Sequence, residues 1–143
     1  MAPPTESTHR ARLRWTPDEE DSRAHTIELG EQVLSASSAP HYKGDPAKAD
    51  PEEMLIGALS SCHMLWFVAL ARAKGLGLTA YEDDAGGILD GTRFTGAILR
   101  PKADFDDDTD AETIHTLHRK AHERCFISNS VNFPVEIEPR GLD

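Results

Sequence analysis

Alternating polar and apolar positions mark the first quarter of the chain as strand-forming. An alternation with a period of two residues turns one side of each segment toward a core and the other toward solvent. Gly30-Glu31 separates two such segments and is typical of a short hairpin turn. The pattern predicts strands at residues 10–16, 24–29 and 32–36, followed by a loop rich in Pro, Gly and Ser at residues 37–49.

One long helix follows this loop. Asp50 fits its N-cap, Pro51 its first position and Glu53 the third position of a capping box, while Gly75 stands just past its end. Residues 54–71 contain no Asp, Glu, Lys or Arg, a length that approaches a membrane span. Small and polar residues lower the apolarity at the centre, and no second span is present. The pattern therefore favours a soluble helix that is buried on all sides.

The second half of the chain predicts further hairpins and one more helix. Residues 101–110 are interpreted as an acidic loop, and residues 110–125 have the pattern of an amphipathic helix. Strands are expected at residues 77–82, 85–89, 93–100 and 133–139. The order predicts an α+β fold in which the helices pack on mainly antiparallel sheets.

Composition and charge narrow the function. The chain has 143 residues, which suits one domain over residues 10–143, after a segment at residues 1–9 that is expected to be disordered. The net charge of −10 argues against nucleic acids and anionic membrane surfaces as partners, because both attract basic faces. The N-terminus has no apolar signal-peptide core, so a cytoplasmic location is expected.

Cys62 lies in the middle of the apolar helix. A free cysteine there usually packs as a small hydrophobic residue, but the polar neighbours Ser60, Ser61 and His63 favour a functional thiol. A reactive thiol needs a nearby cation, and the helix has none near its midpoint. Glu52 is ten residues away, about 15 Å along the helix axis, and cannot reach Cys62.

A homodimer would solve this geometry. If two copies of the helix crossed antiparallel near Gly57, Glu52 of one copy would lie beside Cys62 of the other. Gly57, Ala58 and Ser61 are small enough for a close approach. We therefore expect the helix to form part of a two-fold interface.

Cys125 ends the second predicted helix and allows two kinds of chemistry. It is an incidental cysteine at a helix end, a second redox-active thiol or, with histidines of the same helix, part of a metal site. His115, His118 and His122 precede it at helical spacing, but His115 and His122 lie about 10 Å apart along the axis. Because at most two of the set can bind one ion, a metal-binding protein using His118, His122 and a cysteine is the weaker alternative.

Two segments resemble the motifs of one family. "DPEEMLIGALSSCHMLWF" and "KAHERCFISNS" are similar to the two cysteine motifs of the OsmC/Ohr family, the osmotically inducible and organic hydroperoxide resistance proteins, and the similarity extends over residues 24–139. The resemblance implies an intertwined α+β homodimer that acts as a thiol peroxidase without metal or cofactor. By position, Cys62 would be the peroxidatic thiolate and Cys125 the resolving thiol. Glu52 would orient an arginine that stabilises the thiolate.

Arg23 is our choice for that arginine, in competition with Arg10, Arg12 and Arg14. The expected reaction is the reduction of organic hydroperoxides at the expense of a thiol or dithiol reductant. His63 and Phe126 depart from the residues that follow the two cysteines in well-known members. These departures leave open a second alternative, a homodimeric stress or binding protein with weak or no peroxidase activity.

Overall fold

The computed structural model describes residues 5–142, in two compact units at Met1–Met54 and Leu55–Asp143. Residues 5–9 of the predicted disordered segment contain no helix or strand, and residues 1–4 lie outside the described residues. The disorder of that segment and the single domain at residues 10–143 stay predictions.

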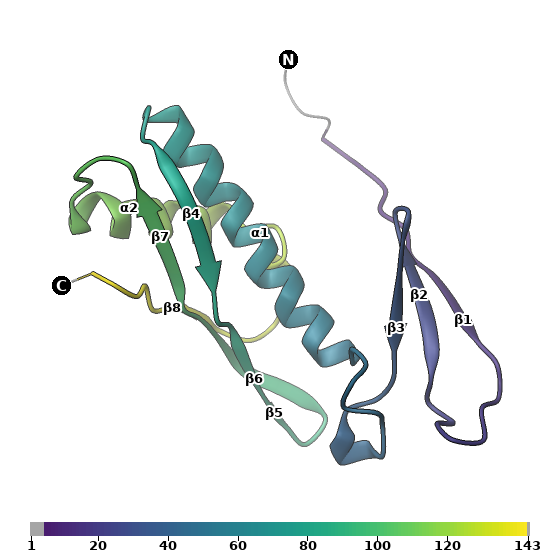
Figure 1. Ribbon diagram of the computed structural model, residues 1–143. Helices are drawn as coiled ribbons and strands as arrows, with labels where there is room; N and C mark the ends of the chain where they lie inside the picture. The colour runs from purple at the N-terminus through teal and green to yellow at the C-terminus, as the bar shows by residue number, and fades with distance from the viewer. Residues whose placement is uncertain (1–4, 143) are drawn as a thin grey trace. The chain divides into compact units, whose positions relative to one another are not determined.

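The first unit contains an antiparallel three-stranded sheet (Figure 1). Its strands pair in the order β1-β2-β3, and Gly30, with φ of 63°, makes the turn between β2 and β3. The three predicted strands are confirmed, with bounds β1 Arg12–Trp15, β2 His25–Leu29 and β3 Gln32–Ala36. A short 3-10 helix, η1 Pro40–Tyr42, lies in the predicted loop.

The long helix α1 Pro51–Ala73 begins where its capping signals predict. The Glu53 backbone N–H donates to the Asp50 carboxylate at 2.7 Å, and the Asp50 N–H donates to the Glu53 carboxylate at 3.1 Å, which together form the capping box. Gly75, with φ of 71°, follows its end.

Burial of α1 within the chain differs from the prediction. One stripe is fully buried, namely Leu59, His63, Phe67 and Ala71, whereas Leu65 is 61% exposed. The expectation of a helix buried on all sides is therefore wrong for the single chain, because the chain supplies packing partners for only one side. By length and composition alone, α1 would also be long and apolar enough to cross a membrane.

The second unit contains two small sheets. β4 Leu78–Asp83 pairs antiparallel with β7 Pro101–Phe105. In the other sheet, β6 Arg93–Leu99 pairs antiparallel with β5 Gly86–Asp90 and parallel with β8 Val135–Ile137. The strands are thus mainly antiparallel, as expected.

β7 corrects the first half of the acidic loop predicted at residues 101–110, whereas residues 106–110 contain no helix or strand, as expected. Ala103 and Phe105 pack against the core while Lys102 and Asp104 face solvent, which is ordinary strand alternation. The proline and the acidic residues suggested a loop, but pairing with β4 satisfies this backbone.

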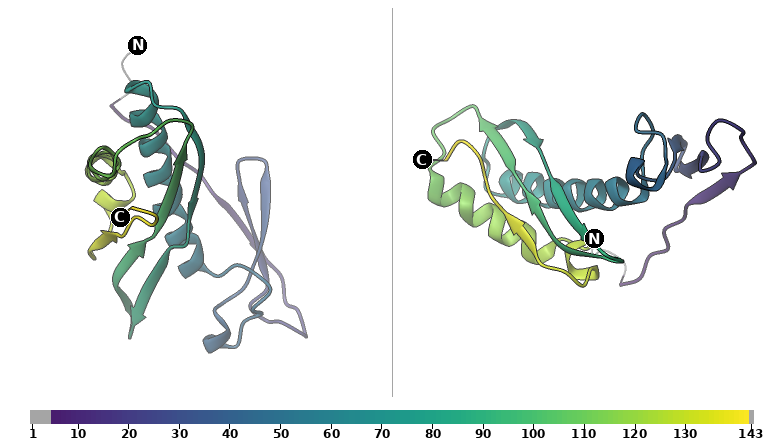
Figure 2. Two further views of the ribbon diagram at one scale, coloured as in Figure 1. Left: turned by 60° about the vertical axis from the view of Figure 1, so that its left-hand side comes forward. Right: turned by 90° about the horizontal axis from the view of Figure 1, so that it is seen from below.

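The second helix, α2 Ala111–Arg124, begins at Asp110, whose carboxylate accepts from the Thr113 N–H at 2.7 Å. A 3-10 turn, η2 Ser128–Ser130, follows it. Figure 2 shows α1 and α2 running beside β4 and β7. Phe67 and Ala71 of α1 pack there against Ile114, Leu117 and Ala121 of α2, and this core fixes the two helices that carry the cysteines.

Candidate active site

The two cysteines come from different helices and lie together. Cys62 is in the middle of α1, and Cys125 is the residue that ends α2. The Cys62 side chain lies close enough to Cys125 to raise the pKa of its thiol, and both are free thiols. Residues 63 positions apart in sequence are thus brought into reach of one another, which is the first requirement for a disulfide.

The two thiols differ in accessibility. Cys125 is only 1% exposed, whereas Cys62 is half-buried. Burial raises the pKa of the Cys125 thiol, and the adjacent Cys62 raises it further, whereas the backbone N–H groups of Ser128 and Ile127 oppose the rise. Because the thiolate is the reactive form, Cys62 is the better placed of the two to meet an outside oxidant.

The turn after α2 holds the Cys125 sulfur. The Ser128 N–H points at this sulfur from 3.4 Å, and the Asn129 N–H donates to the Cys125 carbonyl at 3.0 Å. The Ser128 N–H thereby stabilises negative charge on the Cys125 sulfur, whereas the Asn129 N–H holds only the backbone.

An aromatic pair lies next to the cysteines in sequence. Trp66, one helical turn after Cys62, meets Phe126, directly after Cys125, edge to face with ring centroids 5.5 Å apart. The Arg124 guanidinium lies over the Trp66 ring at 5.8 Å. Phe126 is 66% exposed, so it offers apolar surface to solvent or to a ligand.

A second buried pair, His63 and His118, joins α1 to α2. His63 Nε2 and His118 Nδ1 are 3.0 Å apart, with the ring planes within 7° of parallel. Burial lowers the pKa of His63 to about 4 and the pKa of His118 to about 3. Both rings are therefore neutral at pH 7, with one ring donating and the other accepting.

Comparison with known proteins agrees with this architecture. Residues 44–140 match the family described as "OsmC-like protein". The chain belongs to the OsmC-like family. It is 28% identical over 120 residues to the uncharacterized protein YmaD of Bacillus subtilis, a match that spans 79% of this chain and 80% of YmaD.

Solved structures give the same family and fold. The OsmC-like protein of unknown function from Vibrio cholerae superposes with a TM-score of 0.87 and 35% identity, over 94% of this chain and 99% of that one. The organic hydroperoxide resistance protein OhrB of Bacillus subtilis superposes with a TM-score of 0.68 and 19% identity, over 94% of this chain and 98% of that one. The α+β OsmC/Ohr fold predicted from the two cysteine motifs is confirmed.

Ser60, interpreted above as part of the polar surroundings of Cys62, has another role in this OsmC-like chain. Its hydroxyl donates to the Asp83 carboxylate at 2.5 Å, and the Arg100 N–H donates to the same carboxylate at 2.6 Å. Ser61 is exposed. Ser60 therefore ties α1 to β4.

Glu52 and Arg23 both belong to the first unit of the OsmC-like chain. The Arg23 guanidinium donates to the Ser22 hydroxyl at 2.7 Å. One carboxylate oxygen of Glu52, Oε2, is buried without a hydrogen-bond partner among the described residues. The action of these two residues on Cys62 stays a prediction.

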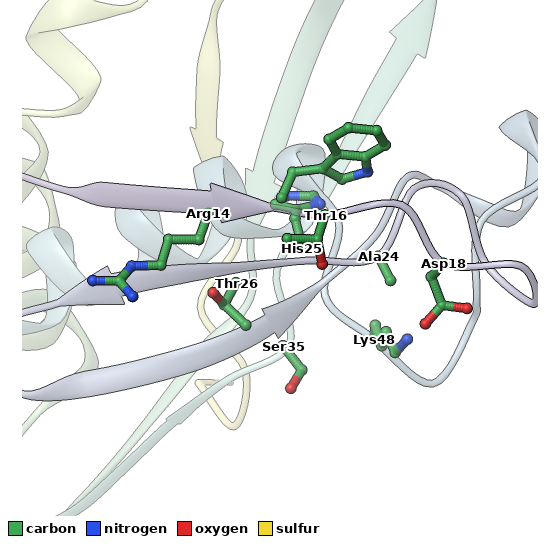
Figure 3. Close-up of a pocket in the computed structure, with 9 residues that line it drawn as sticks. Arg14, Thr16, Asp18, Ala24, His25, Thr26, Ser35 and Lys48 are labelled. Atoms are coloured by element: carbon green, nitrogen blue, oxygen red, sulfur yellow. The ribbon is translucent and has the colours of Figure 1, made fainter.

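Arg14, another candidate arginine, lines a cavity of about 280 Å³ in the first unit (Figure 3). The close-up shows Arg14 and Thr26 at one end and Asp18 with Lys48 at the other. The cavity contains neither cysteine and is lined mostly by exposed residues.

The histidines of α2 do not form the alternative metal site. His115 is exposed, His118 is buried against His63, and His122 Nδ1 is 3.4 Å from the Ser128 hydroxyl. Residues 5–142 contain no group of three or more His, Cys, Asp or Glu side chains with the geometry to hold a metal ion.

His118 is the site-related residue whose role the sequence did not show. Its helical spacing from Cys125 suggested only a metal ligand. A buried His one residue after Cys62 was a signal that α1 needs a polar partner, because buried imidazoles require a hydrogen bond.

Proposed function

We propose that this protein is a thiol-dependent peroxidase that reduces organic hydroperoxides, with Cys62 as the peroxidatic and Cys125 as the resolving cysteine. The carrying observation is the proximity of two free thiols of unequal accessibility on different helices. Family membership supports the proposal, because related structures include proteins named for organic hydroperoxide resistance.

The reaction follows from the two thiols. The Cys62 thiolate attacks one oxygen of the hydroperoxide, the O–O bond breaks, and the alkoxide leaves and takes a proton to become an alcohol. Cys62 is now a sulfenic acid. The Cys125 sulfur attacks this sulfur and releases water, and a disulfide forms. An external thiol or dithiol then returns two electrons and two protons by thiol–disulfide exchange.

The apolar surroundings favour organic substrates. Trp66 and the exposed Phe126 lie beside the cysteines in sequence and in contact with each other. Such surfaces bind the hydrocarbon part of an alkyl hydroperoxide through burial of apolar area, which hydrogen peroxide cannot offer.

The activating charge is proposed to come from a second copy of the chain. On the family pattern, Glu52 orients Arg23, and the guanidinium lowers the pKa of the peroxidatic thiol. The unpartnered, buried Oε2 of Glu52 supports this assignment, because a buried carboxylate oxygen without a partner is costly.

Helix α1 supports the proposed homodimer. Gly57, Ser61, Leu65 and Ala69 form an exposed stripe at four-residue spacing, opposite in burial to the stripe that meets the core. Small side chains with one exposed leucine allow a second α1 to approach closely.

Thiol titration tests the peroxidase proposal. One equivalent of cumene hydroperoxide should remove both thiols, and peptide mapping should find a disulfide between Cys62 and Cys125. The Cys62→Ser variant should lose turnover while keeping its circular dichroism spectrum, because Ser is close to Cys in size. Full peroxidase activity in Cys62→Ser would overturn the mechanism.

The burial of Cys125 favours one alternative, an OsmC-fold stress or binding protein with little peroxidase activity. A resolving thiol that is 1% exposed and has a raised pKa is a poor nucleophile at rest. If the hydroperoxide left both thiols titratable in the folded wild-type protein, this alternative would replace the peroxidase.

A further inference from the structure

The His63–His118 pair has no part in the proposed reaction, yet it lies close to the reacting cysteines. His63 directly follows Cys62 in α1. His118 precedes Cys125 by seven residues in α2, about two helical turns. The two helices therefore meet at a thiol contact and at an imidazole contact that are adjacent in α1.

Each ring depends on the other for its hydrogen bond. The rings are 1% and 3% exposed, and the Nε2–Nδ1 contact of 3.0 Å is the one that both share. The remaining nitrogens, His63 Nδ1 and His118 Nε2, have no hydrogen-bond partner among residues 5–142. A slide of one helix past the other would leave both imidazoles without partners in an apolar core, which is strongly unfavourable.

The packing around the pair is aromatic and leaves little freedom. His118 stacks on Phe67 with ring centroids 4.3 Å apart, and Tyr81 of β4 lies 6.4 Å from His118. Two nearby titratable groups lie on α2. The charge of His122 adds to burial in lowering the pKa of His63, and the charge of His115 does the same for His118. The hydrogen bond is thus the directional element in a contact that is otherwise apolar.

We propose that His63 and His118 are positioning residues for disulfide formation, because their hydrogen bond sets the alignment of α1 and α2 that holds Cys62 beside Cys125. A disulfide tolerates only a narrow range of Cα separations, so a shift of one residue along α1, about 1.5 Å, is enough to disturb it. The inference rests on the redox role of the cysteine pair given under the proposed function, but not on hydroperoxide as the oxidant.

Diamide oxidation of the full chain provides the test. Diamide takes two electrons and two protons from the thiols and becomes a hydrazine, while one disulfide forms. The double variant His63→Leu/His118→Leu removes both imidazoles together, so that no buried polar ring is left without a hydrogen-bond partner. It should close the Cys62–Cys125 disulfide about 10-fold to 100-fold more slowly, as expected when reacting groups are displaced by about 1 Å.

Two single variants show whether the hydrogen bond itself matters. His118→Asn keeps a polar atom at the position of Nδ1, so its disulfide should close at a rate near that of the wild type. His115→Asn changes an exposed histidine on the same helix and should leave the rate unchanged. If His118 only filled space, the rate of disulfide closure would not depend on whether an amide or an apolar side chain replaced the imidazole. A folded double variant that closes at the wild-type rate would overturn the proposal.

A measurement on the wild type covers the case in which the double variant does not fold. If the imidazole pair sets the alignment of the thiols, then disulfide formation must in turn act on the pair. The ¹⁵N resonances of His63 and His118 should therefore shift on oxidation, while those of exposed His41 should not. Unchanged His63 and His118 resonances would refute the positioning role. Normal diamide closure without any hydroperoxide turnover would instead refute the peroxidase and leave this inference standing.

Discussion

At the scale of single residues, the molecule separates two kinds of buried polar side chain. Cys125 is buried beside a second thiol and backbone donors, whereas His63 and His118 are buried beside each other. The cysteine pair can be oxidised and reduced, whereas the histidine pair can only gain or lose a proton. The sequence places Cys62 and His63 side by side, but helical geometry sends them to different partners on α2.

Cys125→Ser should separate the two halves of the reaction. Without the resolving thiol, Cys62 can still be oxidised by a hydroperoxide, but no intramolecular disulfide can form. We expect one equivalent of hydroperoxide to be consumed and a sulfenic acid to be trapped by dimedone, detected by mass spectrometry. Cys62→Ser is the control and should give no adduct. Continued turnover of Cys125→Ser at the wild-type rate would show that an external thiol resolves the sulfenic acid.

The histidine pair should make the protein less stable in acid. Both imidazoles have a pKa below their ordinary value of about 6.5 in the folded chain, so the unfolded chain binds more protons below that pH. Stability is therefore complete above pH 6.5 and is lost as the pH falls toward 4. We expect a loss of about 2 kcal/mol per imidazole between pH 7 and pH 5.

Urea unfolding at both pH values measures this loss. The variant His63→Leu/His118→Leu should lose less stability over the same interval, while His41→Gln, an exposed position, should behave like the wild type. Equal losses in the wild type and the double variant would assign the acid sensitivity to other groups.

At the scale of elements, the ends of the two helices follow from local chemistry and their packing does not. Asp50 with Glu53 begins α1, and Asp110 begins α2, each through carboxylates that accept backbone N–H groups. β7 shows the opposite case, because its proline and acidic residues suggest a loop and only pairing with β4 makes it a strand. Partners distant in sequence therefore override local preference.

Asp50→Ala should weaken the start of α1. It removes the carboxylate that accepts the Glu53 N–H at 2.7 Å, and loss of such a cap costs about 1 kcal/mol. Chemical denaturation should show this decrease in the free energy of unfolding. The control Glu31→Ala, at an exposed position outside both helices, should change it little, and equal effects of the two substitutions would argue against the cap.

At the scale of the whole molecule, the single chain leaves much of α1 uncovered. The exposed stripe from Gly57 to Ala69 is apolar or small, and Leu65 within it is 61% exposed. A helix with this surface needs a second apolar partner in water. This is the physical basis for the homodimer proposed above.

Gly57→Leu should separate dimerisation from folding. A Cβ at Gly57 meets no atom within 4 Å in the single chain, so the larger side chain leaves the fold intact. It would, however, stand between two closely crossing helices. Sedimentation should show a dimer for the wild type and for Gly57→Ala, and a monomer for Gly57→Leu at micromolar concentration. A wild-type monomer would contradict the dimer, and a Gly57→Leu dimer would place the interface elsewhere.

The sequence by itself determined the helix boundaries, seven of the eight strands within a few residues of their ends, and the family through the motifs around Cys62 and Cys125. These features depend on periodicity, capping and residue order, which are local. Only the tertiary structure decided that Cys62 meets Cys125, that His63 meets His118, and that Ser60 binds Asp83. Each of these contacts joins residues at least 23 positions apart, and spacing along a chain does not specify which buried side chains pack together.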